Sequence, residues 1–550
     1  MKIRAVLIAL LLFSFSTLFL HTAWDKSPTW DEVGYLGLGA YLLKNGRWDV
    51  PAACSHPPLA YYLHSLPAFF YPIDWSAWNY DPSLARDIGF LRSADVKRGN
   101  TLLLDSRYDG EQFFFACRTT SLIFAGLLAF LLLCWARQLY GPWRSLLPLL
   151  LFAFSPNILA HAPLITTDFP LTATFFLAVF ALRHLLLVPT LAGIGLTGLS
   201  LGLALLSKLS ALILLPGFAL VLIWFLLWAS PAQKQSLTEL FPLSRLRTPI
   251  RSCSALYISV IALAILVLWA GYGFRFAPYW LTLRSQLWDI SSGHAAYLMG
   301  DFSSRGWWYF FPLAFLIKTP LPTLLLSVLG LGSICRQIDS DSRIELGFLL
   351  LPPLLLFILF TVSCSKNIGL RYLLPVYPFV FLVAGAAMRS TPRKIVRSLP
   401  TVALYLWYIV CTIHIHPHHL AYFNELIGGP ENGYRYLVDS NLDWGQDLKG
   451  LKRFMDSRGI RRIKLSYFGT VDPALYDLDY EWLPSFLLPR RSPDPVVLPT
   501  SGYIAISVTN LVGVYMDAYG HGKHLFRWLD KYEPIARIGY SIHVYYVPPP

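Results

Sequence analysis

Apolar segments recur along most of the chain and are separated by short polar connections. A helix of about twenty residues crosses a hydrocarbon core of about 30 Å. The first segment is followed by HTAWDKSPTWDE, which offers only a poor signal-peptide cleavage site, so we expect an uncleaved helix. The pattern predicts eleven spanning helices, near residues 3–21, 113–136, 145–163, 169–187, 189–207, 210–228, 253–272, 309–334, 344–362, 372–388 and 398–415.

Composition agrees with an integral membrane protein. The 550 residues are 55% hydrophobic and only 14% charged, with a mean hydropathy of +0.50, whereas soluble domains are about 25% charged. The net charge of +13 does not indicate a nucleic-acid partner, because the basic residues are spread over the connections and the C-terminal tail. The seven cysteines are scattered singly and predict neither a disulfide framework nor a zinc site.

The basic residues also orient the predicted helices. Lys2 and Arg4 precede the first segment, and with this end inside, the even-numbered connections are cytoplasmic. Basic residues such as Arg137, Lys234, Arg336 and Lys394 fall in these connections, in agreement with the positive-inside bias. The first loop (22–112) is then outside, and an odd number of helices places the tail outside as well. We therefore expect a multi-pass protein of the inner (plasma) membrane, with its chemistry on the extracytoplasmic face.

The last part of the chain has a different pattern. Within 416–550, GQDLKGLKRFMDSRG is typical of an amphipathic helix that ends at Gly459, and RIKLSYFG and YIAISVTN are typical of strands. ARIGYSIHVYYV predicts a closing strand or hairpin, and LPRRSPDPVVLPTS a proline-rich loop. The chain is thus divided into a transmembrane domain (1–415) and a small extracytoplasmic α/β domain (416–550).

Two acidic positions fall at predicted outer turns. Asp31 and Glu32 are adjacent, so their side chains diverge and are poorly placed to be the facing carboxylates of a glycoside hydrolase. One base suffices when the leaving group is a phosphate. Asp168, in LITTDFPLTATFFL, is costly at such a turn unless it faces a cavity or a partner. The alternative for all three is helix capping, which Pro170 favours for Asp168.

Three cations are candidate partners for a phosphate. Lys208 and Arg371 fall at predicted outer helix ends, where snorkelling to the interface is the alternative. Arg371 is suited to a two-pronged grip on phosphate. Lys318 falls inside a predicted span and is followed by TPLP, which suggests a broken helix lining a cavity.

Two polar clusters are tempting as metal sites. HIHPHH supplies His414, His416, His418 and His419, which match no common zinc spacing. DSNLDWGQD supplies Asp439, Asp443 and Asp447, but it lacks the central Gly and closing Glu of a calcium loop. We interpret the histidines as interface packing and the acids as capping and domain docking, and a divalent cation has no support in the sequence.

Taken together, several motifs resemble bacterial members of the superfamily of protein O-mannosyltransferases and lipid A aminoarabinose transferases. They are the pair Asp31–Glu32, HPPLAYYL from His56, Asp168, IKTPLP, NIGLRYLLPVYPF and HLAYFNELIGGPENGYRYLVDSNLDWGQDL. The resemblance implies a GT-C fold and an inverting glycosyltransferase that moves a sugar from a polyprenyl-phosphate carrier to an acceptor hydroxyl. It implies no nucleotide sugar and no tightly held metal.

The resemblance also implies roles for individual residues. Asp31 is expected to be the base that takes the acceptor proton, Glu32 to position the acceptor or the site, and Asp168 to be the second-loop acid. Lys208, Lys318 and Arg371 are our inferred phosphate partners rather than firm matches to the family, and His56, in the HPPLAYYL motif, is a further expected substrate-binding residue.

The acceptor is left open as a protein, a lipid or a cell-envelope glycan. The loop at 273–308 is too short for the sugar-binding repeat domain of eukaryotic O-mannosyltransferases, and the tail differs from the extra helices of the aminoarabinose enzymes. A transporter or flippase of a lipid-linked sugar is the alternative function, which predicts inverted repeats and several midplane charges. A non-catalytic scaffold would not need acids at two outer turns.

Overall fold

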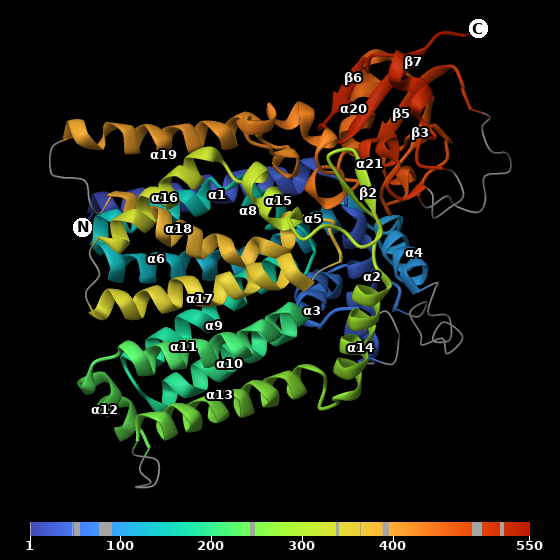
Figure 1. The fold of residues 1–550 in the computed structure, drawn as a ribbon. Coiled ribbons are helices and arrows are strands. Elements are labelled where there is room, and N and C mark those ends of the chain that lie inside the picture. Colours follow the sequence, from blue (N-terminus) through green and yellow to red (C-terminus); the bar gives the residue numbers. More distant parts are fainter. Residues whose placement is uncertain are drawn as a thin grey trace.

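The computed structural model describes residues 2–46, 48, 55–75, 91–241, 248–336, 340–363, 365–388, 395–486, 498–516 and 522–549. Long apolar helices lie side by side, and a small sheet covers one end of the bundle (Figure 1). The N-terminus lies at the opposite end (Figure 1). The predicted class, a multi-pass α-helical membrane protein with a small C-terminal sheet, is confirmed.

Seven helices in the described ranges are long and apolar enough to cross a membrane. They are Lys2–Asp25 (α1), Gly110–Arg144 (α5 and α6), Asp168–Leu187 (α9), Leu209–Trp228 (η5 and α11), Pro249–Gly271 (α13), Arg343–Ser363 (within α17, Ser340–Ser363) and Leu370–Met388 (η7, α18 and η8). A bent pair brings the number to eight, and Leu191–Ser207 (α10) and Leu399–Ile415 (within α19, Ile395–Ile415) are shorter. The predicted total of eleven is not confirmed.

Two predicted spans are interrupted. The 309–334 segment consists of α15 (Phe310–Lys318) and α16 (Leu321–Cys335), which are bent by 105°. This is the break that its prolines predicted. The prediction of one helix over 145–163 is wrong, because α7 (Leu146–Ala153) ends before Ser155 caps α8 (Pro156–His161). Pro156 has no N–H to continue the preceding helix, but it is well suited to the first helical position.

The first loop folds into short helices at the end of the bundle that carries the sheet (Figure 1). They are α2 (Trp30–Asn45), α3 (Leu59–Ser65), η2 (Leu66–Phe70) and α4 (Leu91–Leu103). Gly37 allows α2 and α4 to approach closely, because a Cβ there would lie 2.3 Å from the carbonyl oxygen of Asp95. Most of the aromatic WSAWNYDP segment lies outside the described residues.

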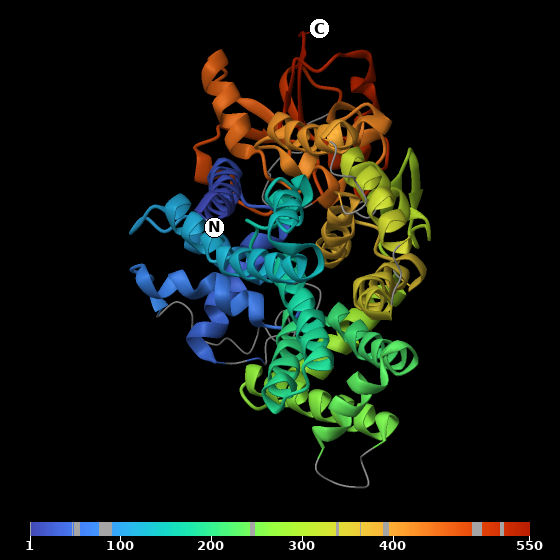
Figure 2. The ribbon, with the colours of Figure 1, turned by 90° about the vertical axis from the view of Figure 1, so that its left-hand side faces the viewer.

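The loop after α13 also folds at this end of the bundle. It consists of α14 (Ala277–Ser292) and a hairpin of β1 (Ala296–Leu298) and β2 (Asp301–Ser303). Figure 2, in which the bundle is turned by 90°, shows the membrane helices nearly end-on. Further short elements are α12 (Pro231–Glu239), η9 (His419–Ala421), η10 (Glu425–Ile427), η11 (Pro430–Arg435), η12 (Asp439–Asn441), η13 (Pro473–Tyr476) and η15 (Arg527–Lys531).

The C-terminal sheet has the strand order β4-β3-β5-β7-β6. Its strands are β3 (Ile463–Ser466), β4 (Tyr480–Trp482), β5 (Gly502–Ser507), β6 (Ala536–Ile538) and β7 (Ile542–Val547). β3 pairs in parallel with β4 and β5, and β7 pairs antiparallel with β5 and β6. The predicted strands are confirmed, and the closing segment is the hairpin of β6 and β7. The proline-rich loop lies largely outside the described residues.

Helix α20 (Leu448–Arg458) precedes the sheet and ends as predicted at Gly459, whose φ of 64° suits glycine. One continuous hydrophobic core joins the bundle to this module. It contains Phe15 of α1 and Phe169 of α9 as well as Leu451 of α20 and Val544 of β7. The module is therefore packed onto the membrane domain, and its predicted boundary at 415/416 stays a prediction.

Candidate active site

Four charged side chains from distant parts of the chain meet at one end of the bundle. Asp31 is in the first turn of α2, Asp168 begins α9, Lys208 follows α10, and Arg371 lies in η7 (Leu370–Val376). Nη1 of Arg371 is 2.9 Å from Oδ2 of Asp31 and 3.4 Å from Oδ2 of Asp168. Nζ of Lys208 is 2.6 Å from Oδ1 of Asp168. We call these four residues the charged cluster.

The charged cluster is buried to different degrees. The side chain of Asp31 is 14% exposed, against 2% for Asp168, 9% for Lys208 and 8% for Arg371. Two acids balance two cations, as buried charges require. Oδ2 of Asp31 pairs with Arg371, whereas Oδ1 accepts no hydrogen bond from any described residue. Asp31 is therefore the acid of the cluster that a substrate reaches most easily.

Glu32 faces the protein interior. Thr29 and Glu32 form a capping box at the start of α2, in which Oε2 of Glu32 accepts from the Thr29 N–H at 2.8 Å. Oε1 accepts from Ile165 N–H at 2.8 Å, in the turn just before Asp168. The side chain is 0% exposed. A contact with acceptor is therefore not supported, whereas the predicted role in positioning the site agrees with these bonds.

Arg118 is a buried partner of Glu32 that the sequence analysis did not single out. It lies on α5 (Gly110–Thr119) and donates from Nε to Oε1 of Glu32 at 2.9 Å and from Nη2 to Oε2 at 2.5 Å. Its other N–H groups reach the carbonyl oxygens of Ala23, Lys26 and Ser27. The available signal was a single arginine within the otherwise apolar end of GEQFFFACRT.

Aromatic rings cover both cations of the charged cluster. The guanidinium of Arg371 lies 4.2 Å from the ring centroid of Trp444, and Nζ of Lys208 lies 4.4 Å from that of Tyr372. Such contacts are attractive because the ring face is electron-rich. Nε of Arg371 is buried and has no hydrogen-bond partner among the described residues. A buried donor without an acceptor is energetically costly.

Lys318 does not join the charged cluster. Its Nζ donates to the carbonyl oxygens of Leu420, at 2.9 Å, and Asn441, and it lies 4.4 Å from the ring centroid of Phe423. The side chain is 1% exposed and bonds to none of the cluster acids. Its predicted role as a phosphate partner is corrected accordingly, because backbone carbonyls already satisfy the ammonium. Lys318 instead ties α15 to the C-terminal segment.

His56 lies within the electrostatic reach of the charged cluster. Its half-buried ring packs edge-on against Tyr35, with ring centroids 5.8 Å apart. Burial, reinforced by the positive charges of Lys208, Lys366 and Arg371, holds the pKa of His56 well below its ordinary value. His56 is therefore neutral at physiological pH, and its predicted contact with substrate stays a prediction.

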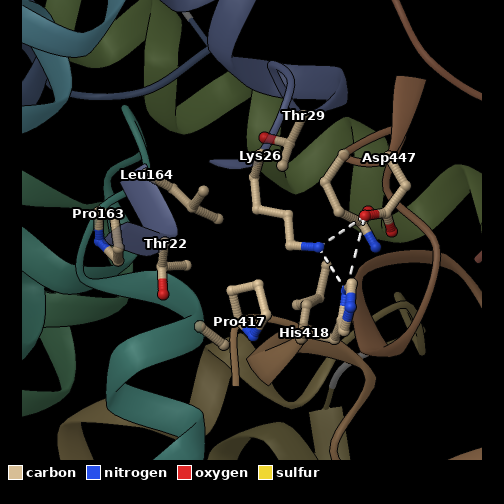
Figure 3. A pocket seen from close by; sticks show the side chains of 11 residues that line it. Thr22, Lys26, Thr29, Pro163, Leu164, Pro417, His418 and Asp447 are labelled. Carbon is tan, nitrogen blue, oxygen red and sulfur yellow. Dashed lines mark hydrogen bonds and ion pairs between the residues drawn. The ribbon is translucent and has the colours of Figure 1, made fainter. Parts of the chain in front are cut away.

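A separate small pocket lies between the end of α1, the turn before α9 and the C-terminal segment. Figure 3 shows Lys26 pointing toward Asp447 and His418. Nζ of Lys26 lies 2.7 Å from Oδ1 of Asp447 and 2.5 Å from Nδ1 of His418. The other lining residues are Thr22, Thr29, Ala160, Pro163, Leu164, Pro417, Leu420 and Gln446. None of the predicted site residues is among the residues that line this pocket.

The histidine cluster connects elements, as predicted. Nε2 of His416 lies 2.6 Å from Nδ1 of His21 on α1, and Nδ1 of His416 lies 3.0 Å from Nε2 of His419. These contacts use opposite ring nitrogens of His416, so the imidazoles form a chain between α1 and the segment after α19. The arrangement agrees with interface packing.

The three acids of the DSNLDWGQD segment each have protein partners, in agreement with domain docking. Asp439 accepts from Tyr515, Asp443 accepts from Thr509 N–H at 2.9 Å, and Asp447 accepts from Lys26. Burial raises the pKa of Asp443 to about 8, against hydrogen bonds from Thr509 that lower it.

Residues 110–269 match a family model described as dolichyl-phosphate-mannose-protein mannosyltransferase. No curated protein matches the chain. Among solved structures, the chain is similar to ArnT from Cupriavidus metallidurans bound to undecaprenyl phosphate, with 12% identity over 98% of this chain and 97% of that chain and a TM-score of 0.47. It is also similar to the Archaeoglobus fulgidus oligosaccharyltransferase AglB in complex with an inhibitory peptide and a dolichol-phosphate, with 13% identity over 94% of this chain and 64% of that chain and a TM-score of 0.41. The resemblance to the protein O-mannosyltransferase superfamily is thus confirmed over residues 110–269, which contain both Asp168 and Lys208.

Proposed function

We propose that the protein is an inverting glycosyltransferase that moves a sugar from a polyprenyl-phosphate carrier to an acceptor hydroxyl at the outer face of the inner membrane. The observation that carries this proposal is the charged cluster. It places a partly exposed carboxylate, Asp31, directly beside a guanidinium, Arg371, that has a spare buried donor. This combination suits one substrate group that loses a proton and another that is a phosphate.

In the proposed reaction, Asp31 is the base. The acceptor oxygen attacks the anomeric carbon from the face opposite to the phosphate and gives its proton to Oδ1 of Asp31, while Oδ2 stays on Arg371. The ion pair with Arg371 and the capping box at the start of α2 fix the direction of this carboxylate. A positioned base of this kind contributes about 10²- to 10⁴-fold in rate.

The cations act on the leaving group. As the bond between the anomeric carbon and the phosphate oxygen breaks, its electron pair stays on the phosphate and negative charge builds there. Arg371 and Lys208 stabilise that charge, and they do so more strongly in the transition state than in the ground state. No proton is needed on the phosphate, which explains why one exposed acid suffices. Asp168 keeps both cations in place when the carrier is absent.

In this reaction the membrane helices hold the carrier. The carrier is an apolar chain in the bilayer with its phosphate at the interface, which matches a charged cluster at the outer ends of the helices. The acceptor, a glycan, lipid or protein hydroxyl, then approaches from the aqueous side. The reaction as proposed uses neither a nucleotide sugar nor a metal ion.

Incubation of the purified protein with a radiolabelled polyprenyl-phosphate sugar and cell-envelope acceptors tests the proposal. We expect release of free polyprenyl phosphate and labelled acceptor, and loss of both in Asp31→Asn. Asp105→Asn is the matched control, because Asp105 lies in the same loop and pairs with Arg107, outside the charged cluster. A wild-type protein that releases no polyprenyl phosphate but moves the labelled lipid between leaflets would instead be a flippase.

A further inference from the structure

The C-terminal module, residues 416–550, contacts the backbone of residues 368–370, just before Arg371. Oγ of Ser440 and Nδ2 of Asn441 donate to the carbonyl oxygen of Ile368, at 3.0 Å and 3.1 Å. Oδ1 of Asn441 accepts from Leu370 N–H at 2.9 Å. At Gly369 a Cβ would lie 2.2 Å from Oγ of Ser440, so the two segments are in direct contact. The position of this backbone therefore depends on the module.

Trp444 contacts both sides of the site. Its indole ring, in a side chain that is 2% exposed, lies against the guanidinium of Arg371. Its carbonyl oxygen accepts from Trp30 N–H at 2.7 Å, at the residue just before Asp31. One residue of the module thus holds the helix start that carries the proposed base and the cation that pairs with it.

The segment that carries Trp444 is anchored to the folded core of the module. Asp443 accepts from Thr509 N–H, and Oγ1 of Thr509 accepts from Asp439 N–H at 3.2 Å. Thr509 lies in α21 (Val508–Val512), which directly follows β5. The contacts therefore run from the sheet through α21 to Trp444 and then to Arg371.

We propose that the C-terminal module completes the active site, with Trp444 as a positioning residue for Arg371. One face of the guanidinium rests on the indole, and Nη1 is held by Asp31 and Asp168. Together these contacts fix the plane in which the unpaired Nε lies. The donors to the phosphate are therefore in position before the carrier binds. Transfer consequently depends on the module.

This inference rests on the proposed function, and steady-state kinetics of Trp444 variants in the full-length protein test it. We expect Trp444→Leu to lower kcat about thirtyfold, the size of a desolvated cation–π contact, with little change in the KM for acceptor. Trp444→Phe keeps an aromatic face and should stay within about threefold of wild type. Trp528→Leu is the matched control, because Trp528 packs in another apolar cluster of the module.

The inference is overturned if Trp444→Leu transfers like wild type, or if Trp444→Phe or Trp528→Leu loses as much kcat as Trp444→Leu. The latter outcome would mean that any damage to the module has the same effect. A double-mutant cycle of Trp444→Leu and Arg371→Met in thermal unfolding provides a test without catalysis. Absence of coupling refutes the contact. A wild-type protein without transferase activity refutes the proposed function, and coupling would still show that the module holds Arg371.

Discussion

Asp31 and Arg371 are 340 positions apart in the sequence, and Oδ2 of the one lies 2.9 Å from Nη1 of the other. The contact joins the helix that follows the first membrane span to the start of a late one. Asp168 is shared between Arg371 and Lys208, so a single network of ion pairs connects four segments. Substituting one of the four residues therefore takes an ion-pair partner from another, and single and double variants can measure that loss.

Arg371→Lys should lower kcat/KM for transfer about tenfold to a hundredfold. Lysine keeps the charge but not the planar fork, so it loses either the contact with Asp31 or the donor to the phosphate. A charge-assisted hydrogen bond is worth about 1.5–3 kcal/mol, which sets this range. The measurement is initial-rate kinetics with the lipid-linked donor. Arg305→Lys, at an exposed bend just after β2, is the control and should behave as wild type.

Removing one partner of the Asp168–Lys208 pair should destabilise the protein more than removing both. Asp168→Asn or Lys208→Met alone leaves a buried charge short of its partner, a cost of about 3–5 kcal/mol for a fully buried pair. The double variant removes both charges and should recover part of the apparent melting temperature. If the two losses simply add in the double variant, the pair is not coupled as the structure indicates.

The neighbours Asp31 and Glu32 should respond to amide substitution in opposite ways. Glu32→Gln breaks the ion pair with Arg118 and should lower stability by about 3–5 kcal/mol, because both side chains are completely buried. Asp31→Asn should lower the melting temperature less, because Asp31 is partly exposed and Arg371 keeps its contact with Asp168, and it should abolish transfer. The two variants are compared in the same thermal unfolding and activity measurements. A stable Glu32→Gln protein that has lost transfer would instead assign a chemical role to Glu32.

Lys318→Met tests the corrected position of Lys318. The methionine has a similar volume but removes the bonds to the carbonyl oxygens of Leu420 and Asn441, leaving two buried acceptors with one partner fewer. We expect a lower melting temperature and an unchanged KM for the lipid-linked donor. A raised KM at unchanged stability would restore the sequence-based assignment of Lys318 to the phosphate.

Hydrophobic patterning was sufficient to predict the class of the protein, and the positions of proline and glycine predicted the break near Pro320 and the end of α20 at Gly459, because each depends on local preferences. It was misleading at 145–163, where an apolar run contains a break at Ser155 and Pro156. Lys318 was misassigned for a related reason. A buried lysine demands acceptors, but a sequence does not distinguish a substrate phosphate from backbone carbonyls that tertiary packing brings to it.

The meeting of Asp31, Asp168, Lys208 and Arg371 was predictable only as far as the sequence puts all four at turns or helix ends that are predicted to lie on the outer side. Which cation pairs with which acid depends on how the helices pack, and packing is not written in local periodicity. The buried contact of Glu32 with Arg118 and the stacking of Trp444 on Arg371 have the same origin. In both cases the two residues lie on segments whose sequences do not indicate that the segments pack together.

Asp443 should make stability depend on pH. Its pKa is about 8 in the folded protein and near 3.8 when unfolded, so between these values the folded state keeps a proton that the unfolded state has released. The contribution to stability is complete below about pH 4, falls as the pH rises and is lost above about pH 8, at roughly 1.4 kcal/mol per pH unit. Asp443→Asn should therefore flatten the pH dependence of the melting temperature between pH 5 and 8.

Asp439, whose pKa burial also raises, acts in the same direction and leaves a residual slope. Equal slopes in wild type and Asp443→Asn would show that Asp443 is ionised in the folded protein, stabilised by the hydrogen bonds from the Thr509 and Gly445 N–H groups.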